Sequence, residues 1–136
     1  MDTSFLDSML DRTTIKPDEV LAPEQMTAWY RAMTLARKCD QKLATLYRQG
    51  KIVGAVYLGI GQEAICTGAV SLLQPNDYFS TVARGLAGWF LRGVEPKQVI
   101  ARWLGRDVPP SHGRELGLFF ADVERYGIAP YHNGSM

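Results

Sequence analysis

The sequence has no apolar run that approaches the ~20 residues needed to cross a bilayer as a helix, so it contains no candidate membrane span. Its formal net charge is only +1, which offers no electrostatic case for binding nucleic acid or an anionic membrane. The first residues, Met1-Asp2-Thr3-Ser4, lack the basic and apolar regions of a signal peptide. We therefore expect a cytoplasmic protein whose partners include neither nucleic acid nor membrane.

Cysteine is scarce: Cys39 and Cys66 are far apart and form no CxxC pair. This favours a reduced protein over a disulfide scaffold, with each cysteine a small buried hydrophobic residue. The sequence also lacks a P-loop, a GxGxxG after a strand, HExxH, GxSxG and a clustered set of metal ligands. We therefore expect no metal site from these residues, and the chemistry has to be argued from individual side chains.

What the sequence does contain is a series of helical patterns separated by glycine and proline. With 136 residues, 46% of them apolar, the chain is long enough for one domain with a core. It divides into an N-terminal arm (residues 1–22), a helical part (23–105) and an irregular, loop-rich tail (106–136). The expected fold class for this segment is mainly α.

The longest predicted helix begins at Pro23 and ends before Gly50. Residues 51–60 are predicted to be an extended loop. The apolar face of the helix is expected to carry residues that recur at helical spacing: Met26, Tyr30, Met33, Leu43, Leu46 and Tyr47. Its opposite face is basic and is interpreted as solvated surface rather than a binding patch: Arg31, Arg37, Lys38 and Lys42.

A second helix, over residues 62–73, is apolar on nearly all sides and is therefore predicted to be buried against its own domain or another subunit. Gly68 in its middle costs ~1 kcal/mol relative to alanine, so we expect this glycine to permit a close helix contact. Further helices are predicted over 84–92 and from Pro96 to Leu104, with Gly105 as the stop.

Several polar residues are candidates for a functional site, each with an ordinary structural alternative. Arg84 can project from the start of a helix and bind phosphate or carboxylate, or it can pair with a nearby acid of the chain. Gln62 and Glu63 lie in a helix first turn, where capping is the simpler role. His112 and His132 lie in the glycine-rich tail, where a histidine can transfer protons or bind a ligand. On local pattern alone we favour the structural alternative for each.

The order of the motifs resembles the N-terminal part of the α subunit of thiamine-diphosphate-dependent E1 components of 2-oxo acid dehydrogenase complexes. The likeness is unbroken over residues 25–114 and looser in the tail. Its motifs are Leu46-Tyr47-Arg48-Gln49-Gly50-Lys51-Ile52, Gly61-Gln62-Glu63-Ala64, Asp77, Arg92-Gly93, Gly105-Arg106, His112-Gly113-Arg114 and Pro130-Tyr131-His132-Asn133-Gly134.

This resemblance implies an α/β thiamine-diphosphate-binding fold and an α2β2 heterotetramer that decarboxylates a 2-oxo acid and passes the acyl group to lipoyl-E2. The implied partners are the C-terminal part of the α subunit, the E1 β subunit and lipoyl-E2. The cofactors of the complete assembly would be thiamine diphosphate and Mg2+, with the cofactor doing the difficult chemistry. The resemblance implies that Arg84 binds the diphosphate and that His132 lies in the loop over the site. It places Gln62 and Glu63 at the active-site edge.

The sequence departs from the family pattern beside Arg84, in extra residues between Arg114 and Pro130, and in where the given sequence ends. Ala83 stands where the family usually has a tyrosine that helps hold the cofactor, and Leu86 replaces a frequent histidine. The sequence given ends at Met136, before the family's Gly-Asp-Gly…Asn signature for Mg2+ and diphosphate. We therefore expect no cofactor binding or turnover by this chain alone. It is either part of an E1 α-like subunit or, as the alternative, a non-catalytic E1 α-like interaction protein.

Overall fold

The structure is a computed structural model that describes residues 22–114 and 120–130. In this part of the chain the elements are α2 (Pro23–Arg48), α3 (Glu63–Ser71), α4 (Leu86–Leu91), α5 (Pro96–Trp103) and α6 (Val123–Tyr126). Extended pairing in the same residues is limited to the isolated bridges Phe79–Ile128 and Asp122–Ile128. The prediction of a mainly α segment is therefore confirmed. None of the described helices is long and apolar enough to span a membrane.

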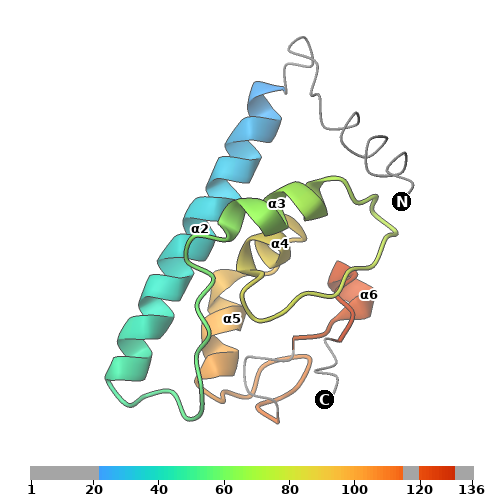
Figure 1. Ribbon diagram of the computed structural model, residues 1–136. Helices are drawn as coiled ribbons and strands as arrows, with labels where there is room; N and C mark the ends of the chain where they lie inside the picture. Colours follow the sequence, from blue (N-terminus) through green and yellow to red (C-terminus); the bar gives the residue numbers. More distant parts are fainter. Residues whose placement is uncertain (1–21, 115–119, 131–136) are drawn as a thin grey trace, which may run out of the picture.

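The long helix α2 runs along one side of the molecule, and α3, α4 and α5 pack against it (Figure 1). Pro23 occupies the first turn, where its missing N–H leaves no intrahelical bond unmade. The helix ends at Arg48, as the glycine two residues later predicts. Its buried residues follow helical spacing: Ala32, Ala36, Cys39, Asp40, Leu43 and Leu46.

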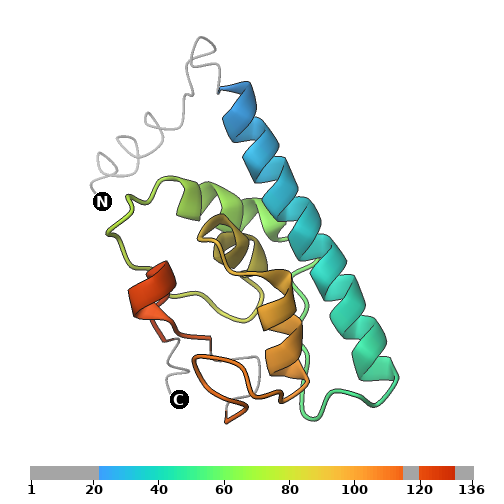
Figure 2. The same cartoon turned by 180° about the vertical axis from the view of Figure 1, so that it is seen from behind.

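The predicted apolar face of α2 is wrong at both ends of the helix. Met26, Tyr30 and Tyr47 are 46%, 69% and 48% exposed. The first turns of α2 extend past the other helices (Figures 1 and 2), and Met26 belongs to the first of them. Tyr30 lies beside the start of α3, where it lines an open hollow with Glu63 and Ala64. The small residues Ala32 and Ala36 are buried instead, because helices approach most closely where side chains are short.

The described chain buries only one face of the second helix, so burial of its other sides against another subunit stays a prediction. Only Glu63, Thr67 and Val70 of α3 are buried, whereas Ile65 is 69% exposed. Leu72, just after the helix, is 79% exposed. Packing against α2 and α4 covers one face of α3 and leaves the other open.

The close contact between α3 and α4 is made by Gly88 rather than by Gly68. A Cβ on Gly68 would meet no described atom within 4 Å, so the predicted role of this glycine is wrong within this chain. A Cβ on Gly88 would lie 2.8 Å from Cγ2 of Val70 on α3, which is too close for real carbon atoms. The absence of a side chain at Gly88 therefore sets the distance between the two helices.

The hydrophobic core combines α2, α4 and α5 with residues of the tail. Its members are Ala36, Cys39, Leu43, Leu46, Ile52, Ala83, Leu86, Ala87, Trp89, Val94, Val99, Trp103, Phe120 and Ile128. The Phe120 ring lies 5.0 Å from the Trp89 ring and stacks beneath the buried Arg102 guanidinium, 4.6 Å from its central carbon. The described part of the tail is thus packed onto the helices. The division at residue 105 stays a prediction.

Arg92 ties the end of α4 to the tail. Its guanidinium donates hydrogen bonds to four backbone carbonyls: Gln74 (3.1 Å), Pro75 (3.1 Å), Asp77 (2.8 Å) and Tyr126 (2.8 Å). The planar guanidinium presents five N–H donors in a fixed fork, whereas a lysine ammonium presents three. This arginine gives the Arg92-Gly93 motif a structural role.

Candidate functional site

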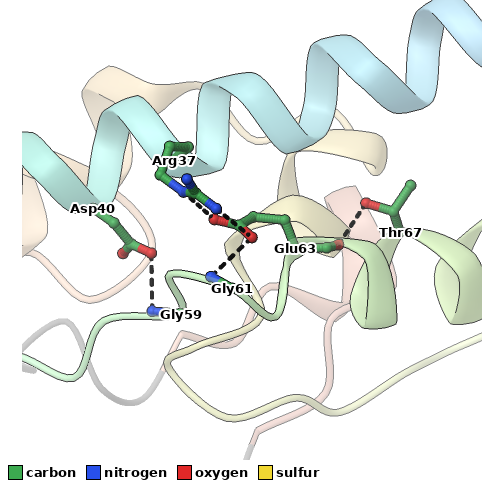
Figure 3. A network of polar contacts seen from close by, with 6 residues as sticks. All are labelled: Arg37, Asp40, Gly59, Gly61, Glu63 and Thr67. Atoms are coloured by element: carbon green, nitrogen blue, oxygen red, sulfur yellow. Dashed lines mark hydrogen bonds and ion pairs between the residues drawn. The ribbon is translucent and has the colours of Figure 1, made fainter.

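The turn that leads into α3 is held to α2 by an ion pair (Figure 3). Nε and Nη2 of Arg37 donate to Oε1 and Oε2 of Glu63, at 2.6 and 3.1 Å. The same Oε2 accepts the backbone N–H of Gly61 at 3.0 Å. Hydrogen bonding from Arg37 is the main cause that holds the pKa of Glu63 below its usual value. Glu63 therefore joins α3 to α2, whereas the local pattern suggested only a capping role.

About one helical turn further along α2, Asp40 binds the first residue of the same turn, Gly59 (Figure 3). Its Oδ2 accepts the backbone N–H of Gly59 at 2.9 Å, and the side chain is only 1% exposed. Oδ1 has no hydrogen-bond partner in the described part of the chain. Burial raises the pKa of Asp40 to about 6, although the hydrogen bond from Gly59 opposes the rise.

Gly59 also lies directly against the segment that carries Arg84. A Cβ on Gly59 would collide with the carbonyl oxygen of Arg84 and would lie 3.1 Å from the carbonyl carbon. Only glycine permits this approach of two backbones. Arg84 itself lies in a turn closed by the hydrogen bond from the Gly85 N–H to the Val82 carbonyl (2.9 Å), immediately before α4. Asp40, Gly59 and Arg84 therefore form one continuous contact.

The guanidinium of Arg84 is available to an anion. The residue is exposed, and within residues 22–114 and 120–130 its side chain makes no ion pair or hydrogen bond. The alternative that Arg84 pairs with an acid of the chain thus finds no partner in the described residues. Gln62 is exposed at the start of α3 and makes no side-chain cap. It lies on the same loop as Gly59 and Gly61.

Of the two histidines in the tail, only His112 lies in the described part of the chain. His112 is exposed, and its Nδ1 lies 2.7 Å from Oδ1 of Asp107. His132, which the resemblance puts over the active site, is outside the described residues. In the part of the chain that the structure describes, no group of three or more potential His, Cys, Asp or Glu ligands could hold a metal ion.

Ala83 and Leu86, the departures on either side of Arg84, are both buried in the core, at 7% and 1% exposure. Neither side chain offers a polar atom to a ligand. The anion-binding capacity of this turn therefore rests on Arg84, with no help from its immediate neighbours.

Sequence reasoning did not single out Arg37 and Asp40 as site residues. Arg37 was assigned to a solvated basic face, but it pairs with Glu63. Asp40 did carry a signal: it follows Ala36 by four residues and precedes Leu43 by three, so it is an acid on the buried face of an amphipathic helix. An ionisable residue in that place has to find a specific partner when the helix packs.

Fold and site together define a helical segment in which a glycine loop is fixed to a long helix and a neighbouring turn presents an exposed arginine. The family of dehydrogenase E1 components matches residues 30–128, which is most of the chain. The chain belongs to this family.

Among curated proteins, the chain is similar to α subunits of pyruvate dehydrogenase E1. It is 33% identical to that of Rickettsia prowazekii over 110 residues, which are 80% of this chain and 34% of the relative. It is 36% identical to that of Zymomonas mobilis over 107 residues, 76% and 30% of the two chains. Identity to the human somatic mitochondrial form is 34% over 108 residues, 79% and 28%. The chain thus spans about a third of the length of these relatives.

Proposed function

We propose that this chain forms part of an E1 α-type subunit and contributes an anion contact for thiamine diphosphate in the decarboxylation of a 2-oxo acid. The observation that carries the proposal is Arg84, an exposed guanidinium with no partner in the described residues, held against a glycine loop. A guanidinium at such a place is well suited to a diphosphate oxygen. Membership of the E1 family supports thiamine diphosphate as the source of that diphosphate.

In this proposal the residues of the chain bind and orient. Arg84 neutralises charge on the diphosphate, and Gln62 and Glu63 form the edge of the site, with Glu63 kept ionised by Arg37. When bound, thiamine diphosphate would supply the carbanion chemistry. The described residues offer no cluster of ligands for Mg2+, so its ligands would come from elsewhere in the assembly.

We further propose that turnover needs the rest of an E1 α subunit, an E1 β subunit and lipoyl-E2 as acyl acceptor. This chain spans about a third of the pyruvate dehydrogenase E1 α subunits to which it is similar. By itself it is expected neither to decarboxylate a 2-oxo acid nor to bind thiamine diphosphate tightly.

A second candidate is a non-catalytic E1 α-like protein that docks on E1 subunits. Two observations favour it: the buried apolar residues Ala83 and Leu86 flank Arg84, and one face of α3 remains open with Ile65 exposed. An apolar residue this exposed next to a packed helix is a reasonable contact for another subunit.

The two candidates are separated by cofactor binding in the assembled protein. The chain would be mixed with polypeptides that supply the remaining E1 α sequence and an E1 β subunit, and titrated with thiamine diphosphate and Mg2+ in a calorimeter. Arg84→Ala is expected to weaken binding by about tenfold or more, because a charged hydrogen bond to phosphate is worth roughly 1.5–3 kcal/mol.

The matched control is Arg31→Ala, which removes an exposed arginine from the N-terminal half of α2. It should leave cofactor affinity unchanged. An assembly that forms but binds no cofactor would favour the docking protein, and equal affinity of Arg84→Ala and the unmodified chain would refute the role of Arg84.

A further inference from the structure

Asp40 has no place in the proposed cofactor contact, yet it is the most buried acid in the described part of the chain. It occupies the core-facing side of α2, and among the described residues its side chain accepts one hydrogen bond, from the Gly59 N–H at 2.9 Å. A buried carboxyl is an unfavourable acceptor for a single N–H, because burial destabilises its charged form. A purely structural acceptor for one N–H would not need to titrate.

The Gly59 backbone is fixed on two sides. Asp40 accepts its N–H, and its Cα faces the carbonyl of Arg84 so closely that a Cβ would not fit. Movement of Gly59 away from Asp40 therefore changes the space that the Arg84 peptide occupies. Interiors packed at this density transmit such shifts rather than absorb them.

We propose that Asp40 is a positioning residue, which acts through Gly59 to hold the Arg84 backbone and so orients the Arg84 guanidinium toward a diphosphate group. This inference rests on the proposed function for its ligand, but the coupling of Asp40 to Arg84 is a property of the chain itself. Asp40 reaches no ligand directly, because it is buried behind the loop (Figure 3).

The strength of the contact depends on the ionisation of Asp40. Three titratable groups face this carboxyl: Arg37 and Cys39 on α2, and Glu63 on α3. Burial raises the pKa of Asp40 to about 6, and the nearby charge of Glu63 acts in the same direction, whereas Arg37 acts against it. An ionised carboxylate is the stronger acceptor for an N–H. The hold on Gly59 is therefore tight above pH 6 and weaker below it.

The test is a pH titration of the 15N-labelled full chain followed by NMR. The Gly59 amide reports the Asp40 bond, and the Gly85 amide shares its peptide group with the Arg84 carbonyl. Both amide signals are expected to shift together between pH 5 and 7.5 with a common midpoint near pH 6. Asp40→Asn keeps an acceptor oxygen and should abolish both shifts.

Asp107→Asn is the matched control, because Asp107 is an exposed acid that contacts His112 and not the loop. It removes a carboxylate of the same type and should leave both titrations in place. The inference is overturned if Gly59 and Gly85 titrate with different midpoints, if only one of them titrates, or if either titration survives in Asp40→Asn.

A second measurement separates this inference from the proposed function. In the assembled protein, Asp40→Asn is expected to keep thiamine diphosphate affinity nearly constant from pH 5.5 to 7.5, whereas the unmodified chain binds up to about fourfold more weakly at the lower pH, because about a quarter of Asp40 is still ionised there. If the amides titrate as expected but Arg84→Ala does not alter affinity, the coupling stands and the cofactor role of Arg84 fails. If Arg84→Ala weakens binding but the amides do not titrate together, the cofactor role stands and the positioning role of Asp40 fails.

Discussion

Replacing Asp40 with asparagine removes a titratable group from the core, so the variant should lose a specific part of the dependence of stability on pH. In the folded chain the pKa of Asp40 is about 6, against an ordinary value of 3.8. Because the folded state holds this proton more tightly than the unfolded state, the protonated carboxyl favours folding. Its contribution to the free energy of unfolding is fully present below pH 3.8 and is lost as the pH rises through about 6.

The size of this contribution follows from the two pKa values. They differ by about two units, and each unit corresponds to about 1.4 kcal/mol, so the full loss is on the order of 3 kcal/mol. Between pH 4 and pH 7.5 the unmodified chain should lose roughly 2–3 kcal/mol relative to the variant. Because Asp40 is only 1% exposed, screening by solvent reduces this free energy little.

The assay is urea unfolding followed by tryptophan fluorescence at several pH values for both chains. The informative quantity is the difference in unfolding free energy between the two chains at each pH. Acids that are remote from Asp40 titrate in both chains and cancel from this difference. The asparagine NH2 adds a constant term, because it does not titrate and has to find its own partner. The change of the free-energy difference with pH therefore does not depend on the asparagine NH2.

A difference that stays constant from pH 4 to 7.5 would refute the reasoning, because it would mean that Asp40 titrates at the same pH in the folded and unfolded states. A difference that changes in the opposite direction would mean that hydrogen bonding outweighs burial and lowers the pKa of Asp40. Either result would also remove the basis for a pH-dependent hold on Gly59.

Two further predictions concern the packing of the helices, and urea unfolding at pH 7 measures both. Gly88→Ala should destabilise the chain relative to Gly68→Ala by about 1–3 kcal/mol, since a Cβ at Gly88 meets Val70 at 2.8 Å and a Cβ at Gly68 meets nothing. Equal stability of the two variants would contradict the close contact between α3 and α4. Arg92→Lys should destabilise by about 1–2 kcal/mol, because an ammonium group cannot reach all four carbonyls. An unchanged midpoint would show that these bonds contribute little.

Local pattern was sufficient to place α2, α3, α4 and α5, but it did not predict the short helix α6. Pro23 and Pro96 each lie in the first turn of a helix, and glycines follow the ends of α2 and α5, as their backbone preferences dictate. Such signals involve residues a few positions apart, so they act before any tertiary contact forms. The motif order was also sufficient to indicate the E1 family, which the match over residues 30–128 confirms.

Local pattern was not sufficient to predict which apolar residues are buried in the folded chain. Ile65 is as apolar as Val70, but only Val70 faces α4. Helical spacing assigns residues to faces, and the arrangement of neighbouring helices decides which face is buried. The same reason explains the exposure of Met26, which lies in the first turn of α2, where the helix extends past the other helices.

The sequence by itself determined the positions of α2 to α5, the places where the chain bends between them and the family to which it belongs, because each depends on residue types and their order. The tertiary structure alone decided the surroundings of Arg84. The contacts in this region join residues that are far apart in the sequence. Asp40 and Gly59 are separated by 19 positions, and Arg37 and Glu63 by 26. Gly59 and Arg84 are separated by 25 positions. These contacts arise only when α2 packs beside the loop, so no local propensity encodes them.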